Sequence, residues 1–231
     1  MCLIPPIGET YPRMSGNRVL VTGFEPFGDD RINPSELIVK HLNGCEIAGA
    51  TIIGRVLPCV FGESSRELRR LIDEMDPSAV LCLGQAGGRE GITLERVALN
   101  VDDARLADNA GGRPIDAAVI EGGPVGYWST LPIKAMVASL VEQGLPASVS
   151  QTAGTYVCNH VFYSLMHHVM TRNGGPRIRA GFIHVPWLPE QVKTRPGQSA
   201  LPLDAQLRAI RSLIETALTS DERRLEGGAE H

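Results

Sequence analysis

A cysteine at the start of a predicted helix is the residue of this chain best placed for chemistry. Residues 148–160 read SVSQTAGTYVCNH, and the alternation up to Gln151 predicts a short strand followed by an Ala-Gly turn. We expect Thr155 to cap a helix whose apolar residues recur at helical spacing. Cys158 then lies in the first turn, where free backbone N–H groups and the helix dipole favour the nucleophilic thiolate. The alternative is a buried core cysteine, the commonest fate of a free thiol.

A histidine stands at the end of another predicted strand, residues 180–185. Ligands of open α/β sheets bind beyond the carboxyl ends of the strands. If the strands before Cys158 and around His184 are neighbours, the two side chains can meet as a thiolate–imidazolium pair. The alternative for His184 is a polar residue satisfied at a strand end. His160 lies on a different helical face from Cys158 and is not predicted to be its base.

Two phenylalanines and a glutamine also follow predicted strands. Phe24 and Phe27 lie in the sequence FEPFG after the first strand, and Gln85 follows the strand that ends in Leu-Gly. Core packing is the ordinary role of phenylalanine. Loops are usually wet, however, so two aromatic rings in one loop suit a flat, mostly apolar ligand.

Other candidate motifs are less specific. The stretch GQAGGR at residues 84–89 is glycine-rich but matches neither the P-loop nor the dinucleotide fingerprint. His167 and His168 have no partner at metal-ligand spacing, so we expect them on the surface. The pair Asp102-Asp103 with Arg105 is either an ion-pair network or part of a site.

The composition bounds the class of protein. The 231 residues are 43% hydrophobic, enough for a large core, and the net charge of −4 predicts no nucleic-acid or anionic-membrane surface. No apolar run reaches the length of a membrane span, and the first residues do not read as a secretion signal. The five cysteines are odd in number and form no CxxC pair or metal spacing. We therefore expect a cytoplasmic protein without a metal.

The predicted elements alternate between strand and helix. We expect strands over residues 17–23, 51–57, 79–83, 92–101, 148–151 and 180–185, and helices over residues 34–42, 63–75, 131–143, 156–169 and 203–218. Asn33 caps the first helix with Pro34 as its first residue, and Ser129 or Thr130 can cap the third. Residues 102–126 read as a long, ordered surface excursion.

This alternation predicts a single-domain α/β/α sandwich with a mainly parallel, twisted central sheet. Residues 17–220 form the domain, residues 1–16 a flexible extension and residues 221–231 a polar tail. Met14 is an alternative start.

The motifs together resemble the pyroglutamyl peptidase I family, cysteine peptidases also called pyrrolidone-carboxylate peptidases. The resemblance spans about residues 17–191, in stretches that are long, ordered and specific. They are VLVTGFEPFG with NPS, GQAGGR with ITLERVALN, DDAR, YWSTLP, the Cys158 segment and GFIHVP.

The resemblance implies a catalytic triad. The family's nucleophile falls on Cys158, its base on His184 and its orienting carboxylate on Glu95. Without the resemblance, Glu95 reads as a solvated strand residue paired with Arg96.

The resemblance also implies a substrate pocket and its support. The residues that the resemblance assigns to substrate binding are Phe24, Phe27, Gln85, Tyr156 and Val157. It assigns Arg105 to support of the oxyanion. Tyr156 departs from the family pattern, which usually has phenylalanine, and its hydroxyl requires a partner or water.

The implied substrates are peptides and proteins blocked by N-terminal 5-oxoproline, and the implied assembly is a homotetramer. No cofactor is needed for such chemistry. Two other functions compete with this one: glycosyl transfer of the nucleoside-phosphorylase type, which requires a phosphate site, and a non-catalytic binding protein with the same fold.

Overall fold

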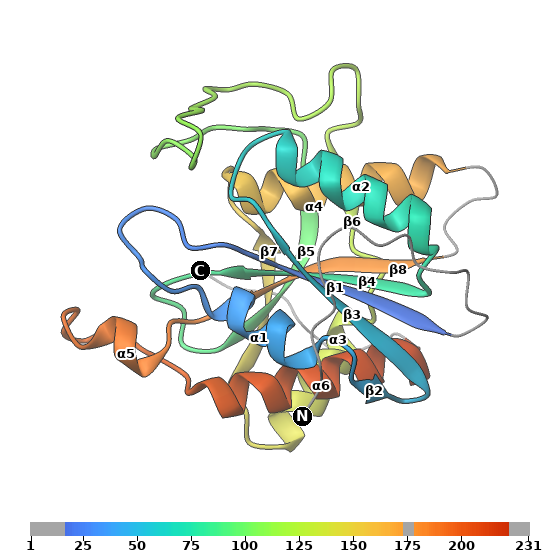
Figure 1. Ribbon diagram of the computed structural model, residues 1–231, viewed down its shortest axis with the longest axis vertical. Helices are drawn as coiled ribbons and strands as arrows, with labels where there is room; N and C mark the ends of the chain where they lie inside the picture. Colours follow the sequence, from blue (N-terminus) through green and yellow to red (C-terminus); the bar gives the residue numbers. More distant parts are fainter. Residues whose placement is uncertain (1–16, 173–177, 222–231) are drawn as a thin grey trace.

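A computed structural model of the chain describes residues 17–172 and 178–221, and one eight-stranded sheet runs through its centre (Figure 1). The strand order is β2-β3-β1-β4-β8-β5-β6, and β7 pairs with β5. The strands are β1 (Arg18–Phe24), β2 (Glu46–Ile47), β3 (Ala50–Leu57), β4 (Ala79–Gln85), β5 (Ile92–Leu99), β6 (Gly126–Trp128), β7 (Ala147–Thr152) and β8 (Arg179–Val185). The predicted flexible extension and most of the predicted polar tail lie outside the described residues.

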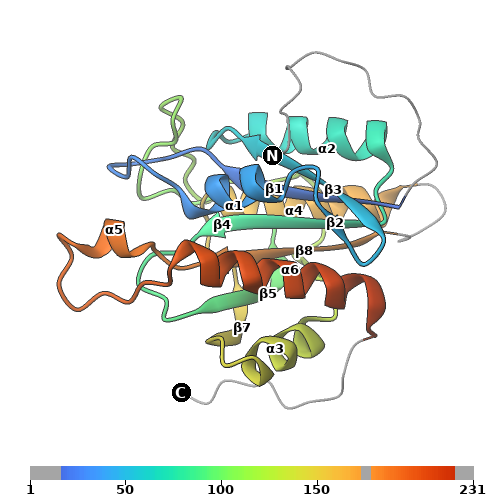
Figure 2. The same cartoon turned by 60° about the horizontal axis from the view of Figure 1, so that its bottom comes forward.

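Helices cover both faces of this sheet. In Figures 1 and 2, α2 and α4 lie on one face, α1, α3 and α6 on the other, and α5 stands off one end. The helices are α1 (Pro34–Leu42), α2 (Glu63–Met75), α3 (Ile133–Glu142), α4 (Val157–Thr171), α5 (Pro189–Val192) and α6 (Leu203–Thr219). The predicted α/β/α sandwich is confirmed.

The central strands β3, β1, β4 and β8 run parallel, but β5 runs antiparallel to β8. β7 is parallel to β5, so it too runs against the central strands. The expectation that the strand before Cys158 neighbours β8 is therefore wrong, because β5 lies between them. Side-chain periodicity reports which face a residue occupies and not the direction of its strand.

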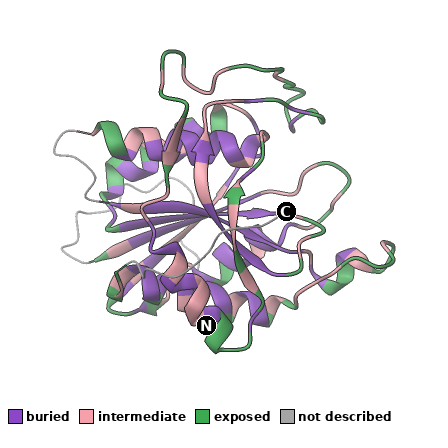
Figure 3. Ribbon diagram, turned by 180° about the vertical axis from the view of Figure 1, so that it is seen from behind, coloured by how far each residue is buried: buried purple, intermediate pink, exposed green. Residues whose placement is uncertain are grey.

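Two apolar clusters, one on each face, hold the layers together. Successive β4 side chains alternate between them: Leu81 and Leu83 face α1, α3 and α6, while Val80 and Cys82 face α2 and α4. Figure 3 shows the central strands buried and the exposed positions on the outer loops, the outward faces of the helices and the edge of the sheet.

The helix starts agree with the predicted caps in one case and differ from them in two. Asn33 accepts the Ser35 backbone N–H at 3.0 Å and Pro34 begins α1, as predicted. The predicted caps of α3 and α4 are wrong, since the cap residues are Pro132 and Tyr156 and neither makes a side-chain cap hydrogen bond. The Thr155 hydroxyl instead donates to the carbonyl of Asp103 at 2.8 Å.

The excursion over residues 102–126 is ordered by its own polar contacts and extends beyond α2 and α4 (Figure 1). Asp108 is central to it: one carboxylate oxygen accepts the N–H groups of Ala110 and Gly112, and the other accepts the N–H of Phe61 at 2.9 Å. The sequence did not predict β2, β6 or α5, which span only two to four residues each.

Candidate active site

Cys158 lies in the first turn of α4, against the carboxyl end of β4. A Cβ built on Gly84 would stand 2.9 Å from the Cys158 Sγ, so the absence of a side chain at Gly84 makes room for the thiol. The register partner of Gly84 on β8 is His184. The thiol therefore lies over the strand position next to the histidine, brought there by α4 rather than by the strand that precedes it.

His184 and Glu95 form a buried pair on the same face of the sheet. The Nδ1 of His184 donates to the Glu95 Oε1 at 2.7 Å, across the antiparallel pairing of β8 and β5. The side chains are 4% and 0% exposed, so the interpretation of Glu95 as a solvated residue is wrong. Because Nδ1 carries the donated proton, Nε2 is the basic nitrogen of the ring.

Sequence reasoning missed a third member of this cluster, Arg89. Its Nη1 lies 2.6 Å from the same Glu95 Oε1, and it also contacts the Thr93 hydroxyl. Arg89 comes from the loop between β4 and β5. This loop belongs to the glycine-rich stretch whose sequence matches no phosphate-binding motif. The signal that could have found Arg89 is Glu95, six residues later, which the resemblance places in the site. A carboxylate buried in a site requires a cationic partner.

Burial and the charges of this cluster together set the direction of each pKa. Burial alone would raise the pKa of Glu95, but the hydrogen bond and charge of His184 and the charge of Arg89 bring it below its ordinary value. Burial lowers the pKa of His184, and Glu95 only partly opposes this. At neutral pH, Glu95 is therefore a carboxylate and His184 a neutral base.

The thiol follows the same logic. Burial raises the pKa of Cys158 well above its ordinary value, and the Glu95 charge adds to the rise while the Arg89 charge opposes it. Burial therefore acts against the expected stabilisation of thiolate by the helix start, which stays a prediction. With a raised thiol pKa and a lowered imidazole pKa, both Cys158 and His184 are neutral at neutral pH.

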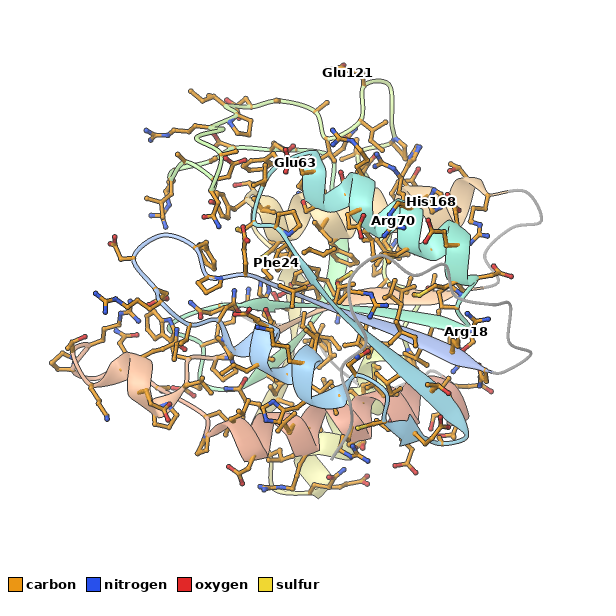
Figure 4. The ribbon with its side chains drawn as sticks, viewed as in Figure 1. Arg18, Phe24, Glu63, Arg70, Glu121 and His168 are labelled. Atoms are coloured by element: carbon orange, nitrogen blue, oxygen red, sulfur yellow. The ribbon has the colours of Figure 1, made fainter. Side chains whose placement is uncertain are left out.

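The two phenylalanines differ in their surroundings. Phe24 is the last residue of β1 and only 2% exposed, with its ring 6.3 Å from that of Phe182; Figure 4 labels it between the sheet and α2. The expectation of a loop position is wrong for Phe24, and its core interpretation is correct. Phe27 is half-buried in the following loop and packs against Tyr156, with 6.0 Å between ring centroids.

The residues directly before Cys158 complete this aromatic surface. The Tyr156 hydroxyl donates to the carbonyl of Ala107 at 3.0 Å, which supplies the partner that the extra hydroxyl requires. Its ring meets Phe61 edge-on at 5.4 Å. Val157 is fully buried in the same cluster.

The Gln85 side chain lies in a polar network. Its Nε2 donates to Asp30 at 2.7 Å and its Oε1 accepts from Gln191 at 2.8 Å. Asp30 also pairs with Arg195 at 2.6 Å. Strand alternation directs Gln85 to the face opposite the side of Gly84 that meets the thiol. These contacts leave Gln85 one amide proton and one lone pair for a ligand.

The structure separates the acidic pair and the arginine that follow β5. Asp102 accepts from His160 Nδ1 at 2.7 Å, so His160 is committed to a different carboxylate from that of the His184 pair. Asp103 donates its N–H to the carbonyl of Thr155, next to the start of α4. Arg105 is exposed two residues later, and no described contact joins it to Cys158.

Within residues 17–172 and 178–221, no group of three or more His, Cys, Asp or Glu side chains is placed to hold a metal ion. None of the helices in the same ranges is both long and apolar enough to cross a bilayer. Of the two adjacent histidines, His168 packs toward α2, where its Nε2 lies 2.9 Å from Asp73 (Figure 4).

The α/β sandwich with a thiol, an imidazole and a carboxylate gathered on one face defines a cysteine-type hydrolase, and comparison with known proteins agrees. The sequence model described as pyroglutamyl peptidase matches residues 17–220. The chain belongs to the pyroglutamyl peptidase family.

Individual relatives cover nearly all of this chain. It is 52% identical to a pyrrolidone-carboxylate peptidase of Cupriavidus taiwanensis over 92% of this chain and 99% of that one. It is 54% identical to pyrrolidone-carboxylate peptidase 1 of Ralstonia nicotianae over 92% and 98%. The crystal structure of Bacillus amyloliquefaciens pyroglutamyl peptidase I is 43% identical with a TM-score of 0.85, over 90% of this chain and 100% of that one.

Proposed function

We propose that this protein removes N-terminal pyroglutamyl residues from peptides, with Cys158 as nucleophile, His184 as general base and acid, and Glu95 as the orienting carboxylate. The observation that carries the proposal is the placement of the Cys158 thiol over Gly84, the register partner of His184, with His184 held by Glu95 at 2.7 Å. Nucleophile, base and orienting group are thus arranged in series.

In the first half-reaction, the Cys158 Sγ attacks the pyroglutamyl carbonyl carbon while its proton passes to the His184 Nε2. The carbonyl oxygen becomes an oxyanion, and the resulting imidazolium is stabilised by Glu95. The C–N bond then breaks, the imidazolium protonates the leaving amine, and a thioester remains on Cys158. Water attacks this thioester with His184 as base, and pyroglutamate leaves as the thiol is restored.

The oxyanion requires donors at the start of α4. The cap residue of α4 is Tyr156, so the N–H of Cys158 has no intrahelical acceptor and is available to a ligand. Arg105 is proposed as a second source of positive charge near the oxyanion. The Asp103–Thr155 contact supports this, because it holds the 102–105 segment beside the helix start.

Substrate selection follows from the missing charge of the lactam. A pyroglutamyl ring has no ammonium group, so apolar walls and amide-type hydrogen bonds must recognise it. We assign the walls to the half-buried Phe27 and Tyr156, with Phe24 and Val157 as the buried support behind them, and a polar contact to Gln85. The cytoplasmic location and the homotetramer expected from the resemblance remain predictions.

Release of a chromogenic amine from an L-pyroglutamyl amide tests this function. We expect hydrolysis of that amide, no hydrolysis of the matching L-prolyl amide, and loss of at least about 1,000-fold in kcat for Cys158→Ser. Cys45→Ser, a control on the far side of the sheet from α4, is expected to keep full activity. Equal rates on the two amides, or an active Cys158→Ser, would contradict the proposal.

A further inference from the structure

One oxygen of Glu95 receives two donors from different parts of the chain. His184 reaches Oε1 from β8 at 2.7 Å, and Arg89 reaches it from the β4–β5 loop at 2.6 Å. The second oxygen, Oε2, is buried and makes no hydrogen bond with the described residues. The two direct contacts of this carboxylate, from Arg89 and His184, therefore meet on a single atom, while the Ser150 side chain adds a smaller influence that lowers the Glu95 pKa.

The difference in exposure gives the two donors different roles. Glu95 is 0% exposed, whereas the Arg89 side chain is 29% exposed at the mouth of the cluster. An ionised carboxylate without solvent contact requires a compensating charge, and at neutral pH the imidazole of His184 supplies a hydrogen bond but no charge. The guanidinium of Arg89 is the permanent cation in contact with this carboxylate.

We propose that Arg89 is a positioning residue of this active site, which fixes the Glu95 carboxylate and, through it, the orientation and basicity of His184. This inference rests on the proposed roles of Glu95 and His184. Arg89 itself touches neither the thiol nor the imidazole in the described contacts, so it acts through the carboxylate and through its field.

The field of Arg89 has a defined sign at both reacting groups. Its charge lowers the pKa of Cys158 and the pKa of His184, against the effect of Glu95 on each. The other titratable groups that act on the thiol are Cys59 and Cys82, whose pKa values burial raises to about 12, and Tyr156, whose pKa burial also raises. All three remain neutral over the working range, so Arg89 and Glu95 are the charged groups that act on the thiol.

The test compares pH profiles of kcat/KM for wild type, Arg89→Met and Arg89→Lys with an L-pyroglutamyl amide. Removing the positive charge strengthens proton binding at both Cys158 and His184. Both limbs of the Arg89→Met profile should therefore move to higher pH, by about one unit for a neighbouring charge in a site of intermediate dielectric. The plateau should fall up to about 100-fold through misplacement of Glu95. Arg89→Lys should keep the limbs near their wild-type positions.

A double variant separates positioning from general damage. If Arg89 acts through Glu95, the plateau loss of Arg89→Met in a Glu95→Gln background should be at least tenfold smaller than in wild type. Arg208→Met, which removes a charge from the exposed Asp204 pair on α6, is the matched control and should move neither limb. Unshifted limbs in a folded Arg89→Met protein, or fully independent losses, would overturn the proposal.

A readout without turnover keeps this test distinct from the proposed function. The rate of Cys158 alkylation by iodoacetamide, followed by mass spectrometry of its peptide, reports the thiol directly. Its pH midpoint should rise in Arg89→Met even if pyroglutamyl amides are not the substrate. A midpoint that stays in place would contradict the role of Arg89, whatever the substrate.

Discussion

At the scale of single residues, burial sets the direction of the Cys158 and His184 pKa shifts in the candidate active site, and two opposite charges adjust them. Glu95 raises the affinity of Cys158 and of His184 for protons, and Arg89 lowers both. The proton affinities of Cys158 and His184 therefore depend on both charges, that of Glu95 and that of Arg89. Substitutions of the two charges should therefore have opposite effects on the pH dependence.

Glu95→Gln is the counterpart of the Arg89 substitution. Loss of the negative charge lowers the pKa values of Cys158 and His184, so both limbs of the pH–kcat/KM profile should move to lower pH. The rate should fall by as much as about 10⁴, because an amide can hold His184 in the wrong tautomer. Glu36→Gln, which removes a carboxylate from the Lys40 pair on α1, serves as the control. A shift to higher pH would show that this electrostatic account of the site has the wrong sign.

The sequence was sufficient to nominate Cys158, His184 and Glu95, because each stands in a motif of the family. It was insufficient for Arg89, whose contact depends on how a glycine-rich loop turns back over β5. It was also insufficient for the Gln85 network, whose partner Gln191 is 106 residues away. Local patterns report residue types and faces, whereas such contacts depend on loop conformation.

At the scale of elements, the distance between α4 and β4 is set by a residue without a side chain. A Cβ on Gly84 would lie 2.9 Å from both the Cys158 Sγ and the ring of Phe182. Gly23 on β1 allows the same close approach of α1, because a Cβ at Gly23 would lie 2.3 Å from the backbone oxygen of Ser35. The two contacts differ in what must yield: a movable thiol and ring at Gly84, and fixed backbone at Gly23.

Gly84→Ala should therefore damage activity more than stability. The methyl group displaces the thiol, and a displacement of this order costs about 100-fold in kcat. Gly23→Ala should instead lower the melting temperature, because neither β1 nor α1 can shift alone. Amine release and thermal unfolding, measured on both variants, check the contrast. Full activity in Gly84→Ala would show that the thiol does not depend on this position.

Elements with strong local signals were predicted well. The amphipathic pattern predicted α2 with the bounds observed, and the Asn-Pro start predicted α1. The cap of α4 was wrong because Thr155 makes its hydrogen bond to the 102–126 excursion instead. Strand direction was beyond the sequence signal, and with it the position of β5 between β8 and β7.

At the scale of the whole molecule, side chains whose pKa values are shifted in the folded protein link its stability to pH. The pKa of His184 is lowered by burial, and that of His167 is lowered by burial and by nearby positive charge. The unfolded chain therefore binds more protons below the ordinary histidine pKa of about 6.5, and stability falls as pH drops through that value. The lowered pKa of Glu95 adds a further loss below about pH 4.3.

Melting temperature measured from pH 8 to pH 4 checks this prediction. His184→Gln and His167→Gln should each reduce the slope between about pH 7 and 5, because the group that gains a proton on unfolding is gone. A wild-type melting temperature that rises as pH falls through 6.5 would contradict the assignment of both histidines as neutral in the folded state.

The position of β8 has a consequence for the order of assembly. β8 is the strand that joins β2, β3, β1 and β4 to β5, β6 and β7, yet it is synthesised after all of them. A nascent chain that ends before residue 179 lacks this link as well as the histidine. The two parts of the sheet must therefore wait for it, which implies slow, non-local closure. The thiol of Cys158 and the carboxylate of Glu95 are both synthesised before β8. They meet the proposed base, His184, only when the sheet closes, so the candidate site is assembled in the same step that joins the two parts of the sheet.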